Sequence, residues 1–268
     1  MKPDQPPAIE IENLRKCYGD VVAVRDLTVD VSQGEIFTYL GPNGAGKTTT
    51  IKILAGLLKP TAGRARIMGH DIQTEPVEAK RAIGYIPDHP YLYEKLTGRD
   101  FYHFIGDLFG MDRARVAERM EEHFALFELE GAEDEFIENY SHGMRQKLVF
   151  SVSLMHEPRV LIVDEPMVGL DPQSARTLKT LLKRKARQEG LAVFLSTHTL
   201  SVAEELADRI GVLHRGELIF SGALDEMRQK AGQGGNLEEM FLRLTGAPLA
   251  GEEPGPPDGS SASAARGE

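Results

Sequence analysis

Apolar and polar positions along the chain follow two different periods. Short, mostly apolar segments predict strands, and these lie at about 8–14, 22–31, 35–40, 64–68, 83–87, 160–164, 191–196, 209–213 and 217–221. Helical patterns are placed between several of these strands, at about 48–56, 173–189 and 201–208. Strands that alternate with helices predict an α/β fold with a mostly parallel sheet and helices on both faces.

Residues 90–157 interrupt this alternation with helices only. Thr97 and Asp100 have the spacing of a capping box. An amphipathic stripe that packs on the core follows at Phe101, Phe104, Ile105, Leu108 and Phe109. A second helix is expected at 112–129 and a third from Ser141 to about 156. We therefore expect a helical subdomain inserted at about 90–157 between two halves of one α/β domain.

The composition changes near the end of the chain. Leu237, Met240, Phe241 and Leu244 have the spacing of one more short amphipathic helix. From Ala247 onward the only large apolar side chain is Leu249, and such a segment cannot offset the entropy of ordering. We expect a single domain over residues 1–246 and a disordered tail over residues 247–268.

Charge and cysteine content limit the class of protein. Lysine and arginine total 31 against 41 acidic residues, for a net charge of −10, which disfavours general binding to nucleic acid. The single cysteine, Cys17, excludes an internal disulfide or a cysteine metal cluster and suits a reducing compartment. The start has no apolar signal-peptide core, and no apolar run approaches the roughly 20 residues that span a bilayer. We expect a chain that is soluble when isolated and is held at a membrane only by another protein.

A phosphate-binding motif directly follows the strand at 35–40. Residues 41–48 are GPNGAGKT, which fits the P-loop pattern G-x-x-x-x-G-K-[ST] in its strand–loop–helix context. The glycines let backbone N–H groups surround phosphates, Lys47 brings positive charge to the β- and γ-phosphates, and the Thr48 hydroxyl reaches Mg²⁺. The expected nucleotide-binding residues are Gly41, Pro42, Asn43, Gly44, Ala45, Gly46, Lys47, Thr48 and Thr49.

Candidate catalytic side chains follow two other strands. VLIVD at 160–164 is a buried strand that ends in Asp164, a carboxylate suited to Mg²⁺ beside the phosphates. Glu165 comes next and can polarise a water for in-line attack on the γ-phosphate. His198 follows the strand at 191–196, and parallel topology brings that strand end to the nucleotide. Lys47, Glu165 and His198 are therefore the predicted catalytic residues.

Taken together, these residues resemble the ATP-binding subunit of ATP-binding-cassette (ABC) transporters over about residues 8–245. The resemblance implies a P-loop ATPase fold with a mostly parallel core sheet, an antiparallel β subdomain and an inserted helical subdomain. It also implies ATP and Mg²⁺ as ligands, and hydrolysis of ATP. Tyr18 lies where the family's adenine-stacking aromatic lies. Asp171, in Gly169-Leu170-Asp171, matches the D-loop that touches the partner subunit, and His198 matches the switch histidine.

The segment Tyr140–Met144, YSHGM, occupies the place of the family signature Leu-Ser-Gly-Gly-Gln. Ser141 is positioned to cap the following helix, and its hydroxyl and the free N–H groups form an anion site. In the family this site binds the γ-phosphate held by the other subunit, so that two ATP molecules lie between head-to-tail subunits. Ser141 and Gly143 are kept, whereas His142 and Met144 depart from the pattern. The change affects the expected hydrolysis rate more than the mode of binding.

Asp88 stands where the family usually has the Q-loop glutamine, after the strand at 83–87. An aspartate can still favour Mg²⁺, directly or through a water, so the expected metal-binding residues are Thr48, Asp88 and Asp164. The added charge also weakens ATP binding before Mg²⁺ arrives. Residues 89–94 follow, where the family forms a groove for a short helix of the membrane subunit. Packing between the two subdomains is the alternative for this segment.

The resemblance therefore implies an ATPase subunit of an ABC transporter, and an ending similar to that of export-type subunits favours an exporter. The implied partners are a transmembrane permease subunit and a second ATPase subunit, in a homodimer or a heterodimer, with no nucleic acid. The implied location is the cytoplasmic face of the cell membrane. The alternatives are a soluble ABC ATPase that acts on DNA or ribosomes, an unrelated P-loop kinase or GTPase, and a cassette that binds ATP without hydrolysing it.

Overall fold

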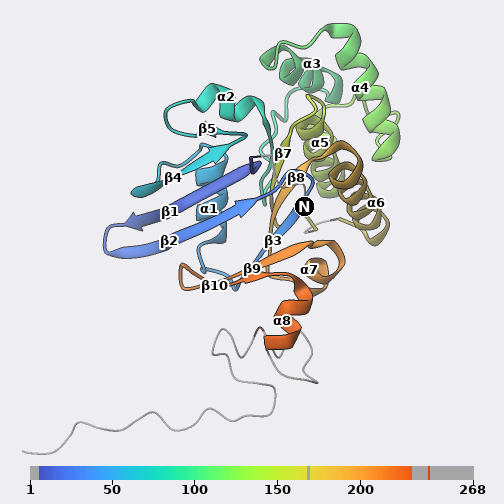
Figure 1. Cartoon of the computed structure of the whole chain (residues 1–268). Helices are drawn as coiled ribbons and strands as arrows, with labels where there is room; N and C mark the ends of the chain where they lie inside the picture. The colour runs from blue at the N-terminus through green and yellow to red at the C-terminus, as the bar shows by residue number, and fades with distance from the viewer. Residues whose placement is uncertain (1–5, 168–169, 231–240, 242–268) are drawn as a thin grey trace, which may run out of the picture.

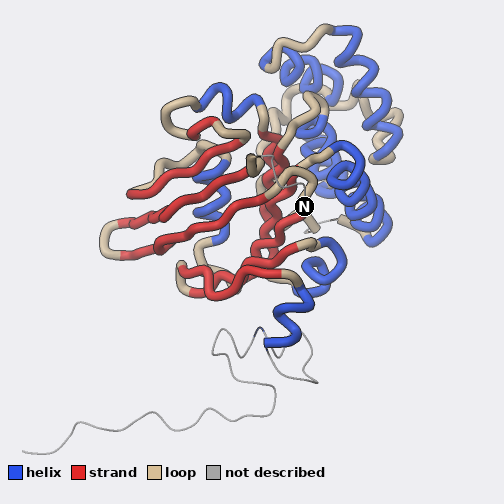
Figure 2. Tube along the Cα trace, viewed as in Figure 1, coloured by secondary structure: helices blue, strands red, loops and turns tan. Residues whose placement is uncertain are grey.

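The computed structural model describes residues 6–167, 170–230 and 241 of the chain (Figure 1). It contains two sheets and a group of helices on one side of them (Figure 2). The strands are β1 (Ile9–Tyr18), β2 (Val21–Val31), β3 (Ile36–Leu40), β4 (Ala62–Ile67), β5 (His70–Asp71), β6 (Ile83–Ile86), β7 (Val160–Asp164), β8 (Ala192–Thr197), β9 (Arg209–His214) and β10 (Glu217–Gly222).

Along the chain, seven of the described helices lie between these strands, and α8 follows the last strand. They are α1 (Lys47–Leu54), α2 (Pro76–Arg81), α3 (Gly98–Leu108), α4 (Arg113–Leu126), α5 (His142–Leu154), α6 (Pro172–Arg184), α7 (Leu200–Leu206) and α8 (Leu224–Lys230). A short 3₁₀ helix precedes α5, and α6 continues into a π-helical segment at Lys185–Glu189.

The larger sheet has six strands in the order β10-β9-β3-β8-β7-β6. All neighbours from β9 to β6 are parallel, and only β10 pairs antiparallel, with β9. Strand β7 is buried on both faces, since Leu161 and Val163 point into one hydrophobic cluster and Val160 and Ile162 into another. The prediction of a mostly parallel core sheet is confirmed, and a buried parallel strand explains the unbroken apolar run.

The second sheet is antiparallel, with strand order β2-β1-β4-β5. Helix α1 packs between the two sheets, because Ile51, Ile53 and Leu54 share a cluster with Ile9 of β1 and Phe194 of β8. The antiparallel β subdomain is therefore confirmed. It covers one face of the core sheet and the helix that follows the phosphate loop.

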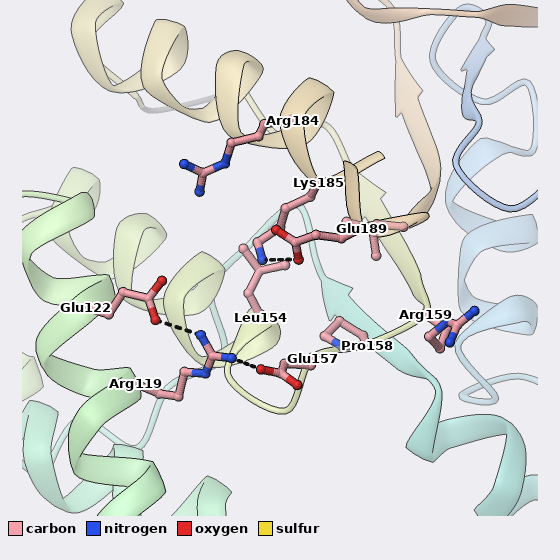
Figure 3. Close-up of a pocket in the computed structure, with 10 residues that line it drawn as sticks. Arg119, Glu122, Leu154, Glu157, Pro158, Arg159, Arg184, Lys185 and Glu189 are labelled. Carbon is pink, nitrogen blue, oxygen red and sulfur yellow. Dashed lines mark hydrogen bonds and ion pairs between the residues drawn. The ribbon is translucent and has the colours of Figure 1, made fainter. Parts of the chain in front are cut away.

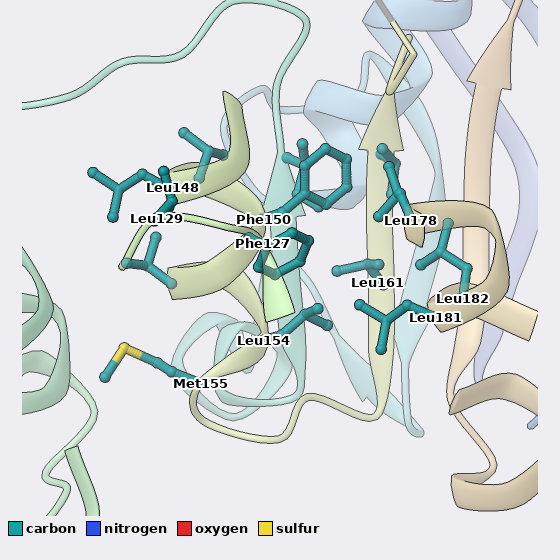
Figure 4. Close-up of a cluster of buried hydrophobic side chains, with 14 of the residues drawn as sticks. Phe127, Leu129, Leu148, Phe150, Leu154, Met155, Leu161, Leu178, Leu181 and Leu182 are labelled. Carbon is teal, nitrogen blue, oxygen red and sulfur yellow. The ribbon is translucent and has the colours of Figure 1, made fainter. Parts of the chain in front are cut away.

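The opposite face of the core sheet carries the helices inserted between β6 and β7 and the helix α6. Figure 4 shows Phe127, Phe150 and Leu154 from the inserted helices beside Leu161 of β7 and Leu178 of α6. Helix α3 begins with the predicted capping box, in which Thr97 and Asp100 bond each other's backbone N–H groups. The inserted helical subdomain is confirmed, although its second helix ends at Leu126, earlier than residue 129.

Some expectations differ from the structure or fall outside it. The sequence analysis missed α2, which begins at Pro76, and α8. The helix predicted around Leu237 and Leu244 and the tail over residues 247–268 lie outside the described residues, apart from Phe241. Within the described part of the chain, no helix combines the length and apolarity that crossing a membrane requires.

Candidate functional site

The phosphate loop connects β3 to α1 at the carboxyl edge of the parallel strands. Gly44 and Gly46 have φ angles of +79° and +108°, which glycine adopts without steric cost. A Cβ atom at Gly46 would also overlap the carbonyl oxygen of Ala23. The backbone N–H of Gly216 donates to the carbonyl of Ala45 at 2.9 Å, which links the loop to the turn between β9 and β10. The loop therefore has the backbone path of a phosphate cradle at a helix N-terminus.

Lys47 is the first residue of α1, and its side chain is only 6% exposed. Its ammonium nitrogen donates to the carbonyl oxygens of Gly41 at 2.8 Å and of Pro42 at 3.3 Å. Burial lowers the pKa of Lys47, and the carboxylate of Glu165 opposes that shift. This places a largely desolvated positive charge directly over the loop, where a γ-phosphate would lie.

The Glu165 carboxylate, after β7, lies between Lys47 at the start of α1 and His198 after β8. Its Oε1 atom lies 3.6 Å from Nζ of Lys47 and 3.0 Å from Nδ1 of His198. The residue follows β7 with a φ angle of +51°, and its backbone N–H donates to the carbonyl of Ser196 at 3.2 Å. A non-glycine residue in the left-handed region is strained and is frequent at functional sites. The three predicted catalytic side chains are thus brought together.

Asp164, the last residue of β7, is 1% exposed. Its Oδ1 atom accepts a hydrogen bond from the Ser196 hydroxyl, whereas Oδ2 has no hydrogen-bond partner among the described residues. Burial raises the pKa of Asp164, the hydroxyls of Ser196 and Thr48 oppose the shift, and the charge of Asp88 adds to it. A buried carboxylate oxygen without a partner is costly unless a ligand uses it. Mg²⁺ fits this oxygen and the neighbouring Thr48 hydroxyl.

Asp88 follows β6 and stands on the same edge of the sheet. Its Oδ1 atom accepts from the backbone N–H of His89 at 2.9 Å, and its Oδ2 atom lies 3.0 Å from Nδ1 of His89. Burial raises the pKa of Tyr85 to about 12, with added contributions from the charges of Asp164 and Asp88. Asp88 and Asp164 therefore both raise the pKa of Tyr85, so both charges lie near this side chain. Within the described residues, no group of three or more His, Cys, Asp or Glu side chains is arranged to hold a metal.

The signature segment, Tyr140–Met144, lies at the start of α5 on the inserted helices and not at the edge of the core sheet. Ser141 caps α5, and its hydroxyl accepts from the backbone N–H of Met144 at 3.2 Å. The Tyr140 hydroxyl donates to the carbonyl of Ala132 at 2.5 Å, while the Ser141 side chain is exposed. No contact recorded between described residues joins Ser141 or Gly143 to the phosphate loop. The capped start of α5 is therefore exposed at Ser141 and His142.

Tyr18 and Asp171 are the remaining predicted contacts. The Tyr18 ring is half-exposed at the end of β1, and the Lys16 ammonium lies 5.2 Å from its centre. Asp171 caps α6 by accepting from the backbone N–H of Ser174 at 2.9 Å and from its hydroxyl at 2.5 Å, which lowers the pKa of Asp171. Gly169 of the same segment lies outside the described residues.

The sequence analysis missed Ser196. Its hydroxyl holds Asp164 in place, and its backbone carbonyl accepts from Glu165. A polar side chain at the end of the otherwise apolar segment LAVFLS was the available signal. This residue lies on the strand next to β7, so only the parallel pairing of β7 with β8 reveals its role.

A cavity of about 550 Å³ lies at the opposite, amino-terminal edge of the strands, between α4 and α6. Figure 3 shows that two of its cations face carboxylates: Arg119 contacts Glu122 and Glu157, and Lys185 lies 2.9 Å from Glu189. The wall has charged pairs but no glycine loop or free helix N-terminus. Although this cavity is large, its wall lacks these phosphate-binding features, so it is not the phosphate site.

A second groove of about 310 Å³ lies between β6 and the inserted helices α3 and α5. Its walls are mainly apolar and include Tyr85, Tyr91, Leu92, Phe101 and Phe109. Tyr91 is exposed, and the ring of Phe109 stacks on His156 with 3.8 Å between centroids. The segment at 89–94 therefore contributes to an open apolar groove.

Comparison with known proteins identifies relatives of the chain. The pattern of the ABC transporter family matches residues 24–168, more than half of the sequence. The daunorubicin resistance ATP-binding protein DrrA3 of Streptomyces coeruleorubidus is 38% identical over 239 residues, which cover 89% of this chain and 75% of that protein.

Solved structures agree with the sequence comparison. A structure of the ATP-binding subunit of an ABC transporter superimposes with a TM-score of 0.84 at 33% identity, over 89% of this chain and 99% of that one. The dimeric ATP-binding cassette MJ0796, in a post-hydrolysis state bound to ADP and Pi, superimposes with a TM-score of 0.74 at 25% identity, over 81% of this chain and 98% of that one.

Proposed function

The chain belongs to the ABC transporter family as an ATP-binding subunit that hydrolyses ATP, and we propose that it powers export through a membrane permease as one half of a head-to-tail dimer. The observation that carries the proposal is the division of the site. The phosphate loop with Lys47 lies on the core sheet, and the outward-facing anion site of Ser141 lies on the inserted helices.

Each ATP in the proposed dimer contacts two subunits. The phosphate loop residues 41–49 bind its phosphates in one subunit, and the adenine stacks on Tyr18 of the same subunit. Ser141 and Gly143 of the second subunit contact the γ-phosphate through the N-terminus of α5. Asp171 contacts the facing subunit beside them. ATP therefore joins the two surfaces, and its hydrolysis separates them.

The roles of the catalytic side chains follow from their contacts. Glu165 orients a water for attack on the γ-phosphate and accepts its proton. His198, 3.0 Å from Glu165, holds that carboxylate and contacts the γ-phosphate. Lys47 stabilises the negative charge on the transferred group. Thr48 and Asp164, with Asp88 beside them, are the proposed holders of Mg²⁺, which neutralises phosphate charge when bound.

Export is proposed because the relative DrrA3 is named for daunorubicin resistance. We propose that the apolar groove with Tyr91 and Leu92 receives a segment of the permease, so that the subunit lies on the cytoplasmic face of the membrane. Aromatic side chains at the rim of an apolar groove suit a protein interface. The family membership does not favour the alternative of an ATPase that acts on DNA or ribosomes.

The test is a pull-down of the tagged Glu165→Gln chain from detergent-solubilised native membranes with ATP and Mg²⁺. We expect a polytopic membrane protein in stoichiometric amount, and either a second copy of this chain or a related ATPase subunit. A Tyr91→Glu variant should lose the membrane protein but keep the ATP-dependent dimer. A catch made only of ribosomal or DNA-bound proteins would contradict the proposal.

A further inference from the structure

Three polar side chains, Glu128, Lys147 and Gln173, meet between the signature helix α5 and the start of α6. Together with the cap Asp171, which feels the charge of Lys147, we call them the Glu128 cluster. The side-chain N–H of Gln173 donates to Oε1 of Glu128 at 2.8 Å. The Lys147 ammonium lies 3.7 Å from Oε2 of the same carboxylate. Glu128 therefore links Lys147 of α5 to Gln173 of α6.

The two helices are the ones that carry the outward-facing contacts of the proposed dimer. Lys147 lies four residues after Gly143 on α5, and residues with this spacing share one face of a helix. Gln173 is the second residue of α6, directly after the cap Asp171 and Pro172. The Lys147 charge also contributes to the lowered pKa of Asp171. One cation therefore faces both the bridging carboxylate and the helix cap.

Glu128 is held in its bridging position by the chain around it. Its φ angle is +56°, and it follows the end of α4, where its backbone N–H donates to the carbonyl of Ala125 at 3.3 Å. The preceding Phe127 is buried in the cluster drawn in Figure 4. Because Phe127 anchors this turn in the core, the backbone from which the Glu128 side chain projects is held in place.

The inner side of the cluster, between Lys147 and the start of α6, is nearly filled. A cavity of only about 10 Å³ lies between Leu126, Phe127, Glu128, Lys147, Ser174 and Thr177. A volume this small holds one water at most. Lys147, which is only 13% exposed, therefore has little room to move inward, and a shift of α5 changes its distance to Glu128.

We propose that Lys147 and Glu128 are positioning residues for ATP hydrolysis, which keep the Ser141 end of α5 in register with the Asp171 end of α6. The inference rests on the proposed head-to-tail dimer, where both ends meet the partner subunit. Glu128 is 58% exposed, so its pairs contribute little to the stability of the fold. Their function is the relative placement of two contacts that must engage together.

The test compares Lys147→Met and Glu128→Gln with a matched control, Lys179→Met. Lys179 lies on the same helix α6, and its ammonium is 2.6 Å from Glu205, also a half-exposed carboxylate, away from the cluster. For each variant the measurements are the kcat and KM of the ATPase and the lifetime of the ATP-bound dimer in the Glu165→Gln background. The thermal midpoint and the binding of a fluorescent ATP analogue to the monomer complete the set.

We expect Lys147→Met and Glu128→Gln each to lower kcat and the dimer lifetime by about tenfold. In the double variant, kcat and the dimer lifetime should be no lower than in the less active single variant. Lys147→Arg should retain activity, and nucleotide binding by the monomer and the thermal midpoint should match the control. Losses equal to the control, or additive losses in the double variant, would overturn the inference. If Glu165→Gln forms no ATP-bound dimer at all, the proposed function fails first; if the dimer forms with an unchanged lifetime in Lys147→Met, only the positioning role fails.

Discussion

Polar side chains are buried in two regions: the interior of the inserted helices, and the carboxyl edge of the core sheet beside the phosphate loop, which we call the phosphate edge. The two regions differ in how these side chains are paired. Inside the helices, the Tyr102 hydroxyl contacts the Ser151 hydroxyl and lies 3.0 Å from Nδ1 of His123, which also lies 3.0 Å from the Ser151 carbonyl. At the phosphate edge, Oδ2 of the buried Asp164 has no partner among the described residues.

The difference separates a structural network from a binding site. A closed network recovers the cost of burying its polar atoms, so it stabilises the helices and has nothing left to offer a ligand. An unpartnered carboxylate oxygen carries that cost until a ligand arrives. The strained backbone of Glu165 and the buried ammonium of Lys47 belong to the same edge. Substitutions in the two regions should therefore have opposite effects on turnover and stability.

The strongest challenge to this comparison is Glu165→Gln. We expect phosphate release to fall by about 10²–10⁴-fold, because the amide cannot accept a proton from the attacking water. The matched control is Glu157→Gln, at the cavity of Figure 3, where the carboxylate is 2.8 Å from Arg115. That variant should hydrolyse ATP at the normal rate. Turnover above a tenth of the normal rate in Glu165→Gln would remove Glu165 as the base.

A mixing experiment sharpens the division of the phosphate edge from the signature segment. Lys47→Ala and Ser141→Ala should each abolish most turnover alone, because every site in either homodimer lacks one contact. In a one-to-one mixture, half of the dimers carry one intact site, so about a quarter of normal turnover should return if the two sites work independently. Phosphate release across mixing ratios measures this. A mixture no more active than its components would contradict the head-to-tail arrangement.

His123 tests the closed network through the pH dependence of stability. Its side chain is 2% exposed, and burial lowers its pKa from 6.5 to about 4. Because the folded-state pKa is the lower one, the unfolded chain takes up the proton first as the pH falls. Stability that is present above pH 6.5 should be lost between pH 6.5 and 4, by up to roughly 3 kcal/mol.

Urea unfolding at pH 7 and pH 5 measures this loss. His123→Gln should be less stable at pH 7 and show a smaller difference between the two pH values. The control is His142→Gln on the exposed start of α5, which should keep the difference found in the unmodified protein. An unchanged difference in His123→Gln would mean that another group controls the acid sensitivity.

Asp88 tests how far the phosphate edge depends on its second carboxylate. Asp88→Asn and Asp88→Gln remove a negative charge beside Asp164, so ATP should bind more tightly without Mg²⁺. The Mg²⁺ concentration for half-maximal turnover should rise by about threefold. Asp107→Asn, on the exposed face of α3, is the control and should leave the Mg²⁺ titration unaltered. Identical titrations for all variants would leave Asp88 as a loop residue.

Gln146 is one of several residues in the inserted helices with unpaired buried polar atoms, and it has the smallest expected effect. Its side chain on α5 is 1% exposed, and neither amide atom has a hydrogen-bond partner among the described residues. Gln146→Leu should raise the free energy of unfolding by about 1 kcal/mol, because it removes unpaired buried polar atoms. Urea unfolding at pH 7 checks this. A loss of stability would mean that the Gln146 amide is paired in the folded protein.

Much of the fold follows from the chain itself. The strand VLIVD and the loop GPNGAGKT have local patterns that tertiary contacts do not override, and both lie where the patterns predicted. Helix α2 was missed because six residues that begin at Pro76 show too short a period. Ser196 and the Glu128 bridge were missed because each acts on residues far away in the sequence.

The sequence by itself determined the phosphate loop, the acidic pair after β7 and the capped helix at Ser141, because each depends on residue types at fixed local spacing. Only the tertiary structure decided that Glu165 lies 3.0 Å from His198, and that Oδ2 of Asp164 is buried without a partner. The physical reason is that parallel pairing of β7 with β8 aligns strand ends that lie far apart in the sequence. Because these ends are buried, the charged groups on them influence one another's pKa.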